Sequence, residues 1–468
     1  MTAGRYWAVL CLVAALSAPL PAQQPRQARN CLIDVDTTGR LNQITQPDSS
    51  RLIFVGGIFR SHCRNQPTTM GSDSVEWYSQ AGELHLIGHA RFRDSTEVLD
   101  ADRITYWTRQ ERVFSEGHVF ARNVKDGSEM RGPNMDYYRA VPPIRDTLEM
   151  LATGRPTIRM HPAEGSASAD TTNPFVIVAD RVKLRHTDRF WGSGHVTIDR
   201  RDMRARSDSA MLNLADSLTW LIGAARVAGR DTTRPASDTA ASYTLTGQRI
   251  RFDLNGAQEI RRVGSYRDAD ATGPDWHLVA DTIVIHVDSS KIQRAQAWGG
   301  ERRPVATSGL TTIVGDSMDI HMPGQVMQLV WAYRSARAVS RPDSAAPEPD
   351  WITGDSLRAT FTRTDSAGTA RSDVDHVDSY GSARALYHTD NAQDSTGTKG
   401  INYSRGQRIN IAMQARKVKI VDIVGQVDGV YLEPRVVRPD TTLRPDTSAV
   451  RPDTTRADTA AVRRPRPR

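Results

Sequence analysis

Seven aspartates recur at one position of a short phrase that repeats along this chain of 468 residues: Asp73, Asp102, Asp180, Asp208, Asp281, Asp316 and Asp355. Paired carboxylates are the groups that general acid–base catalysis requires, so a polysaccharide-cleaving enzyme built on a parallel β-helix is one interpretation. Such an enzyme needs a charged cluster that interrupts the repeat at one level, and the sequence contains none. Because the aspartates recur with the repeat itself, we interpret them as structural residues.

Three histidines share one position in a second repeated phrase, where each follows a glycine: His89, His118 and His195. Stacked imidazoles are potential metal ligands, but no cysteine or acidic residue lies near them at ligand spacing. The sequence also lacks a glycine-rich phosphate loop, a serine-nucleophile elbow and a paired-cysteine motif. We therefore expect no metal, no cofactor and no enzymatic activity.

The phrase that carries the aspartate has the pattern of a β-strand with one register step. In the copy at 99–106 (LDADRITY), apolar residues lie two positions before Ala101 and three and five positions after it. Even spacing before the aspartate and odd spacing after it indicate a β-bulge or sheet corner that keeps the apolar face inward. Ten copies keep this frame, centred on Ser72, Ala101, Gly132, Ala179, Ser207, Gly247, Ala280, Gly315, Gly354 and Gly406.

Between these copies lies a second strand that usually opens with glycine, at Gly88, Gly117, Gly194, Gly223 and Gly425. A fixed frame with variable connections is typical of a stacked β-solenoid or an elongated jelly roll. We therefore predict an all-β fold of about ten two-strand repeats, arranged as an elongated β-jelly roll or β-solenoid-like V of two sheets. If the units stack in parallel, about 4.8 Å apart, they give a slab about 45 Å long.

The ends of the chain differ from the repeat region. Arg5, an apolar stretch and Pro21-Ala22 predict a secretory signal peptide at 1–22, with an uncleaved membrane anchor as the alternative. We expect a linker at 23–50, the β-repeat jelly roll at 51–434 and a disordered tail rich in Arg, Pro, Asp and Thr at 435–468. The chain has a net charge of +7, but the signal contributes +1 and the tail +5, which leaves about +1 for the repeats. This balance does not favour nucleic acid as a partner.

Cys31 and Cys63 remain after removal of the signal peptide. A disulfide between them would attach the N-terminal segment to the first repeat in an oxidising compartment, and two unrelated thiols are the alternative. We expect the protein to be periplasmic and associated with the outer membrane.

The alternation of a Gly-x-Val/Ala strand with a small-residue–Asp–x–apolar–x–Tyr strand resembles the OstA-like (LptA) family of periplasmic lipopolysaccharide-transport proteins, which also forms the N-terminal domain of LptD. The stretch 88–121 carries the resemblance best, and weaker copies extend it from about Arg51 to Pro434. The resemblance implies a jelly roll shaped like a half-open V, whose inner face holds the acyl chains of lipid A. It also implies edge-strand pairing with jelly-roll components of the inner and outer membranes, and end-to-end homo-oligomers. This chain is longer than the usual bridge protein, and it has His, Ala, Ser or Gln where the family commonly has Asn.

The inward positions of the repeat predict the lining of a lipid-binding groove, with plain core filling as the alternative. The predicted lining residues are Trp77, Ile104, Tyr106, Tyr137, Val182, Leu184, Leu212, Ile250, Phe252, Ile283, Ile285, Met318, Ile320, Leu357, Phe361, Ile409 and Ile411. The opposite face is often basic, and we expect it to be solvated. The sequence therefore predicts a non-enzymatic bridge for lipopolysaccharide or a similar multi-acyl lipid. A closed structural or adhesin-like scaffold is the first alternative, and a polysaccharide-active β-helix enzyme is the less favoured one.

Overall fold

The computed structural model describes residues 30–161, 174–186, 188–213, 215–230, 242–255, 259–341, 348–366, 369–390, 399–414 and 417–433. The expected signal peptide at 1–22 and tail at 435–468 lie outside these residues. The described chain is all-β: 27 strands form one continuous hydrogen-bonded sheet, accompanied by a single 3-10 turn, Pro323–Gln325. None of the described residues forms a helix long and apolar enough to span a membrane.

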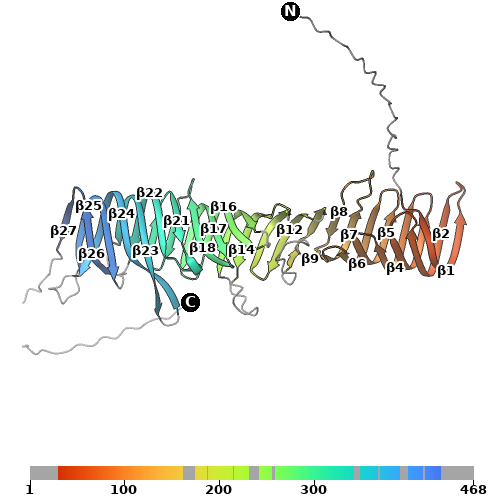
Figure 1. Cartoon of the computed structure of the whole chain (residues 1–468), viewed down its shortest axis with the longest axis horizontal. Helices are drawn as coiled ribbons and strands as arrows, with labels where there is room; N and C mark the ends of the chain where they lie inside the picture. The colour runs from red at the N-terminus through yellow and green to blue at the C-terminus, as the bar shows by residue number, and fades with distance from the viewer. Residues whose placement is uncertain are drawn as a thin grey trace, which may run out of the picture.

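The strands follow one another along a single long axis, from β1 at one end to β26 and β27 at the other (Figure 1). The first half comprises β1 Ile33–Thr45, β2 Arg51–Cys63, β3 Thr69–Tyr78, β4 Glu83–Arg93, β5 Glu97–Trp107, β6 Arg112–Asn123, β7 Glu129–Tyr138, β8 Glu149–Thr153, β9 Thr157–Met160, β10 Phe175–Val178, β11 Arg181–Arg185, β12 Arg189–Arg200, β13 Met203–Asn213 and β14 Leu218–Gly229. The second half comprises β15 Tyr243–Leu254, β16 Ile260–Thr272, β17 Trp276–Asp288, β18 Lys291–Trp298, β19 Val305–Ser308, β20 Thr311–Val314, β21 Ser317–His321, β22 Leu329–Ser340, β23 Asp350–Ser366, β24 Thr369–Asp390, β25 Lys399–Gln414, β26 Lys417–Val424 and β27 Asp428–Leu432.

The sheet is antiparallel, which corrects our expectation of a solenoid of parallel-stacked units. Successive strands pair as neighbours, as β4 does with β5 and β5 with β6, so both strands of each repeat lie one after the other along the axis. Five pairs, β8/β9, β10/β11, β18/β19, β20/β21 and β26/β27, are the halves of interrupted strands, so the 27 strands make 22 rungs. At about 4.8 Å per rung, the stack is about 100 Å long rather than the expected 45 Å.

The sheet also begins earlier than expected. The segment 23–50 was predicted to be a linker, but β1 lies within it and pairs with β2. The sequence of β1 carries little alternation because this edge strand has one neighbour and leaves Val35, Leu41 and Ile44 more than 40% exposed.

Each full strand turns a corner where the ladder changes register. Between β5 and β6, Asp100 faces Phe120 and Arg103 faces Glu116, so two residues of β5 oppose three of β6. The predicted register step is therefore present, but the inserted residue belongs to the glycine strand, opposite the aspartate. Gly117 is one of two successive residues there with positive φ, which is the backbone geometry of a bulge. The same geometry occurs at Gly88-His89, Gly194-His195, Gly223-Ala224, Gly381-Ser382 and Gly425-Gln426, and without glycine at Arg267-Asp268 and Arg334-Ser335.

The strand halves on either side of the corners form two layers. Layer 1 contains halves such as 97–101 of β5, and layer 2 contains halves such as 103–107. Their inner faces pack together: Phe92 of layer 1 and Tyr106 of layer 2 meet edge to face, with ring centroids 5.4 Å apart. One cluster of buried apolar residues fills the space between the layers from Cys31 to Ile411.

Besides the terminal pair β26/β27, the corner is interrupted in two regions, where strands break into one half for each layer. Strands β7, β8, β11, β12, β10 and β9 then pair in a closed ring, and β17, β18, β21, β22, β20 and β19 form a second ring of six. These two regions are the places where the chain departs most from the regular repeat.

Candidate functional site

The structure places all of the predicted groove residues in the core between the layers. Fifteen of them are at most 7% exposed: Ile104, Tyr106, Tyr137, Val182, Leu212, Ile250, Phe252, Ile283, Ile285, Met318, Ile320, Leu357, Phe361, Ile409 and Ile411. Trp77 and Leu184 are partly buried and pack against the same cluster. These residues all lie on the inner face of layer 2, so together they make one wall of the interior.

The facing wall was not in the predicted set. Layer 1 contributes the apolar residues two positions before each corner, such as Leu99, Ile177 and Leu278, and residues of the glycine strands, such as Phe92 and Val227. All five are at most 1% exposed. The sequence does contain a signal for Leu99, Ile177 and Leu278, because the repeated phrase has an apolar residue two positions before its small residue.

The layers are joined through the backbone only at their corners. Among the described residues, the turns that join one rung to the next lie alternately on the free edge of layer 1 and the free edge of layer 2. We call these edges the rims, and the line along which they face each other the mouth. Within the described residues, no strand pairs from one rim to the other. Side chains therefore close the mouth.

Near the N-terminal end, a buried polar cluster crosses the mouth. Arg139, on the rim of layer 2, donates from Nε to Asp94 Oδ2 on the rim of layer 1 (2.8 Å) and also pairs with Glu111 on its own rim. Its Nη1 and Nη2 donate to Gln66 and Thr68 of layer 1, each at 2.8 Å. The side chains of Arg139, Asp94 and Glu111 are at most 6% exposed, so these charges are paired with little help from water.

Tyrosine and glutamate side chains extend this cluster. Burial raises the pKa of the Tyr106 phenol, which stays protonated and donates to Glu111 at 2.7 Å. Tyr137 donates likewise to Asp94 at 3.1 Å. Burial also raises the pKa of Glu97 to about 8, and the charge of Asp94 adds to the effect, although a hydrogen bond from Asn123 opposes it. Glu97 is therefore largely a neutral acid at pH 7. None of these polar residues was predicted to belong to the site.

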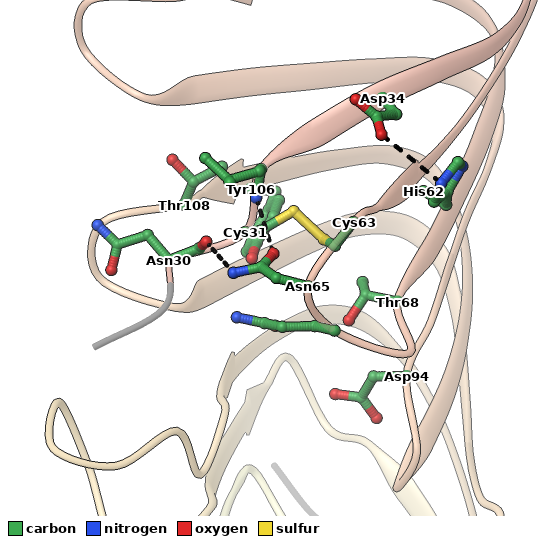
Figure 2. The surroundings of a disulfide bond; sticks show 12 residues. Asn30, Cys31, Asp34, His62, Cys63, Asn65, Thr68, Asp94, Tyr106 and Thr108 are labelled. Atoms are coloured by element: carbon green, nitrogen blue, oxygen red, sulfur yellow. Dashed lines mark hydrogen bonds and ion pairs between the residues drawn. A yellow bond between two sulfur atoms is a disulfide. The ribbon is translucent and has the colours of Figure 1, made fainter. Parts of the chain in front are cut away.

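The disulfide between Cys31 and Cys63 is present beside this cluster (Figure 2). In the same view, Tyr106 and Thr68 lie near the bridge, and Asp94 lies farther from it. The backbone N–H of Cys31 also donates to Glu111 Oε1 at 3.3 Å. The bridge thus attaches the start of β1 to the rim of layer 1, which Arg139 contacts from the rim of layer 2.

Two small apolar cavities interrupt the core on the mouth side. The first, of about 60 Å³, lies beside the first ring and is lined by Met130, Met135, Met150, Met160 and Phe190, with Glu97 at its margin. The second, of about 40 Å³, lies near the C-terminal end and is lined by residues that include Val374, Tyr387 and Met413. Methionine side chains repack at low cost, so the first cavity can enlarge around an apolar guest.

The long hairpin of β23 and β24 crosses the mouth beside the second cavity. Ser372, from layer 2, donates to Asp275 Oδ2 at 2.7 Å, and Ser308 donates to the Ser372 carbonyl at 3.4 Å. Asp275 and Ser308 belong to the rim of layer 1. A second polar contact between the rims therefore lies far along the axis from Arg139.

The histidines of the repeat lie on the outer corner, each bonded to an aspartate of the preceding motif strand. The Nδ1 atom of His89 lies 2.8 Å from Asp73, and those of His118 and His195 lie 2.8 and 2.7 Å from Asp102 and Asp180. Among the described residues, no group of three potential ligands could hold a metal ion. These pairs are components of the corner, in which the aspartate also packs against the glycine.

The sequence matches no protein-family model and no curated protein sequence.

Proposed function

We propose that this protein is a periplasmic lipid-binding bridge that carries lipopolysaccharide, or a similar multi-acyl lipid, between the membranes of the envelope. In this proposal the two layers are the arms of an OstA-like jelly roll, and the acyl chains enter between them. The observation that carries the proposal is the continuous apolar interior, which runs from Cys31 to Ile411. Within the described part of the chain, the layers on either side of it pair through the backbone only at their corners.

The energetics favour such a conduit. Burial of a methylene contributes about 0.8 kcal/mol, so a single acyl chain in the interior is held by several kcal/mol. The inward residues of successive rungs are similar in type. An acyl chain that moves by one rung therefore replaces its apolar contacts with equivalent ones. A guest can therefore slide along the axis without a deep trap.

The mouth offers a route of entry. Its closure rests on side-chain contacts such as those of Arg139 and Ser372, which separate at lower cost than a backbone ladder. The two cavities on the mouth side mark places where the layers pack incompletely. We propose that lipid enters at these places and displaces the flexible methionines.

The two ends of the stack fit the expected partners. Edge strand β1 exposes Leu41 and Ile44, and β26 and β27 expose Val424, Val430 and Leu432, each more than 50% exposed. Unpaired edges with apolar side chains are templates for strand addition. We propose that they join jelly-roll components of the two membranes or further copies of this chain.

Photo-cross-linking in cells tests the lipid site without a disruptive charge in the core. A benzophenone amino acid replaces Met150 or Val374, which line the two cavities, or Thr353, which points outward from β23. We expect adducts with lipopolysaccharide from the first two positions and none from Thr353. Equal labelling at all three positions, or none at the two interior positions, would contradict the proposal.

The closed scaffold is the second candidate, and one observation favours it. Side chains of the two layers themselves bury interior residues such as Ile285 and Ile320 completely. A dry core of this kind predicts no adduct from Met150 or Val374 and no lipid in extracts of the purified protein. The same experiment therefore separates the two candidates.

A further inference from the structure

The outer face of layer 2 carries most of the tryptophans of this chain. Five of the nine, Trp107, Trp191, Trp220, Trp298 and Trp331, alternate with buried neighbours and point outward from this layer. On the outer face of layer 1, Trp351 is the one tryptophan among the described residues. Layer 2 is also the layer whose outward positions were predicted to be basic and solvated. Large rings on such a face need an explanation other than burial.

Four outer rings of layer 2 gather near the second ring of strands, and we call them the aromatic belt: Trp298, Trp331, Tyr333 and Tyr380. Trp331 stacks against both tyrosines, with ring centroids 6.0 Å apart in each case and interplanar angles of 6° and 21°. The guanidinium of Arg408 covers Tyr380 at 5.0 Å. The rings of Trp331 and the two tyrosines are therefore fixed in place. Tyr333 remains 41% exposed, and Trp298 is 42% exposed.

The belt has a regular spacing across the strands. Trp298 faces Ser317, which faces Tyr333; Tyr333 then faces Ser356, which faces Tyr380. Large rings thus occupy alternate rungs, about 10 Å apart, and a small serine separates each pair. This spacing is close to the repeat of one disaccharide in an extended β-1,4-linked glycan.

A hollow of about 910 Å³ lies beside the belt and carries hydrogen-bonding groups. Trp298 and Tyr333 line it together with Arg303, Asp316 and Asp355. Arg303 Nε lies 3.0 Å from Asp316, and both side chains are about half exposed. These carboxylates and this guanidinium can exchange their water for the hydroxyl groups of a ligand.

The wall of the hollow is held in position by backbone contacts. The loop 299–304 replaces a regular corner between β18 and β19, and Asp281 accepts hydrogen bonds from the N–H groups of Gly300 and Arg302. These backbone hydrogen bonds keep the pKa of Asp281 below its ordinary value. The loop is therefore an ordered part of the site.

We propose that the aromatic belt and this hollow bind an oligosaccharide, an extended β-1,4-linked glycan that runs across the strands. The apolar faces of pyranose rings stack on Trp298 and Tyr333, the two exposed rings that line the hollow, and their hydroxyl groups bond to the charged side chains of the hollow. Planar rings with polar groups between them suit sugars, which have an apolar face and a polar edge. The apolar interior takes no part in this site, so it is independent of the lipid-binding proposal.

Isothermal titration calorimetry of the purified protein with soluble N-acetylglucosamine hexamer tests this site, with maltohexaose as the ligand of different linkage. The variants are Trp298→Ala and Tyr333→Ala, whose exposed rings contribute little to folding. The control is Trp351→Ala, which removes a tryptophan from the opposite outer face. Circular dichroism verifies that each variant keeps its β-structure.

We expect the hexamer to bind wild type and Trp351→Ala equally. Each belt variant should bind at least tenfold more weakly, a difference of about 1.4 kcal/mol. The absence of binding at millimolar hexamer overturns the proposal. An equal loss in Trp351→Ala overturns the location, and equal binding of maltohexaose overturns the β-1,4 assignment. Saturation of the belt by a co-purifying protein, lost in the belt variants, identifies a protein interface instead and also overturns the proposal.

Discussion

Arg139 and Asp94 meet across the mouth, 45 residues apart in the sequence, with Arg139 Nε 2.8 Å from Asp94 Oδ2. One residue lies on the rim of layer 2 and the other on the rim of layer 1. No strand of the described chain joins these rims, so this buried ion pair substitutes for a backbone ladder at the N-terminal end.

Replacement of Arg139 by methionine should loosen this end of the protein. The variant leaves Asp94 and Glu111 buried without their cation, a change that costs about 3–5 kcal/mol. We expect faster amide hydrogen exchange in β3–β7 and unchanged exchange in β22–β25. The matched control is Arg91→Met, which breaks an exposed pair with Asp100 and should cost at most about 1 kcal/mol. Equal effects of the two variants would rule out a special role for the buried pair.

Glu97 should make stability depend on pH. Its pKa is about 8 in the folded protein against an ordinary 4.5, so between these values the folded state keeps a proton that the unfolded chain releases. Stability is therefore lost as the pH rises from about 5 to 8, by up to about 5 kcal/mol at 1.4 kcal/mol per pKa unit. Glu97→Gln keeps the acceptor for Asn123 but carries no charge. Urea unfolding at several pH values should show a flatter profile for this variant, and parallel profiles would disprove the assignment.

The corner at Gly117 should require glycine. Gly117 has φ of +73°, and an added Cβ would lie 2.3 Å from Asp102 Oδ2. Gly127 has nearly the same φ, +72°, but a Cβ there meets nothing within 4 Å. Both alanine variants bear the cost of a left-handed backbone, about 1–2 kcal/mol, whereas Gly117→Ala adds overpacking of about 1–3 kcal/mol. Urea unfolding of the two variants measures the difference, and equal destabilisation would mean that the aspartate moves away freely.

Loss of the disulfide should release β1 selectively. The bridge closes a loop between residues 32 positions apart, and a loop of this length contributes about 3–4 kcal/mol. In the double variant Cys31→Ser/Cys63→Ser, we expect faster hydrogen exchange in β1 and little change in β22. If the amides of β1 exchange at their original rate, its pairing with β2 is sufficient to hold β1 in the sheet without the disulfide.

The corners could be predicted from the repeat because each corner changes the spacing of the apolar residues within a single strand. The odd spacing between Ala101 and Ile104, which are both buried, can be seen in the sequence of a single strand. It places the register step of the ladder between these two residues. The direction of strand pairing cannot be recognised in this way, because a strand alternates apolar and polar residues in the same manner beside an antiparallel or a parallel neighbour. The expectation of parallel units, and hence of a short slab, was wrong for this reason.

The polar cluster could not be found in the sequence by spacing. Arg139, Asp94, Glu111 and Gln66 come from four separate segments at the rims and meet only when the rungs have stacked. The aromatic belt also depends on register: Trp298 and Tyr333 lie 35 positions apart and acquire their spacing through Ser317.

Because each rung pairs only with its neighbours, the length of this molecule is independent of its cross-section. Insertion or removal of one two-strand repeat changes the reach by about 10 Å and leaves the width of the interior and the chemistry of both ends as they were. A protein built in this way can be fitted to gaps of different widths by repeat number alone.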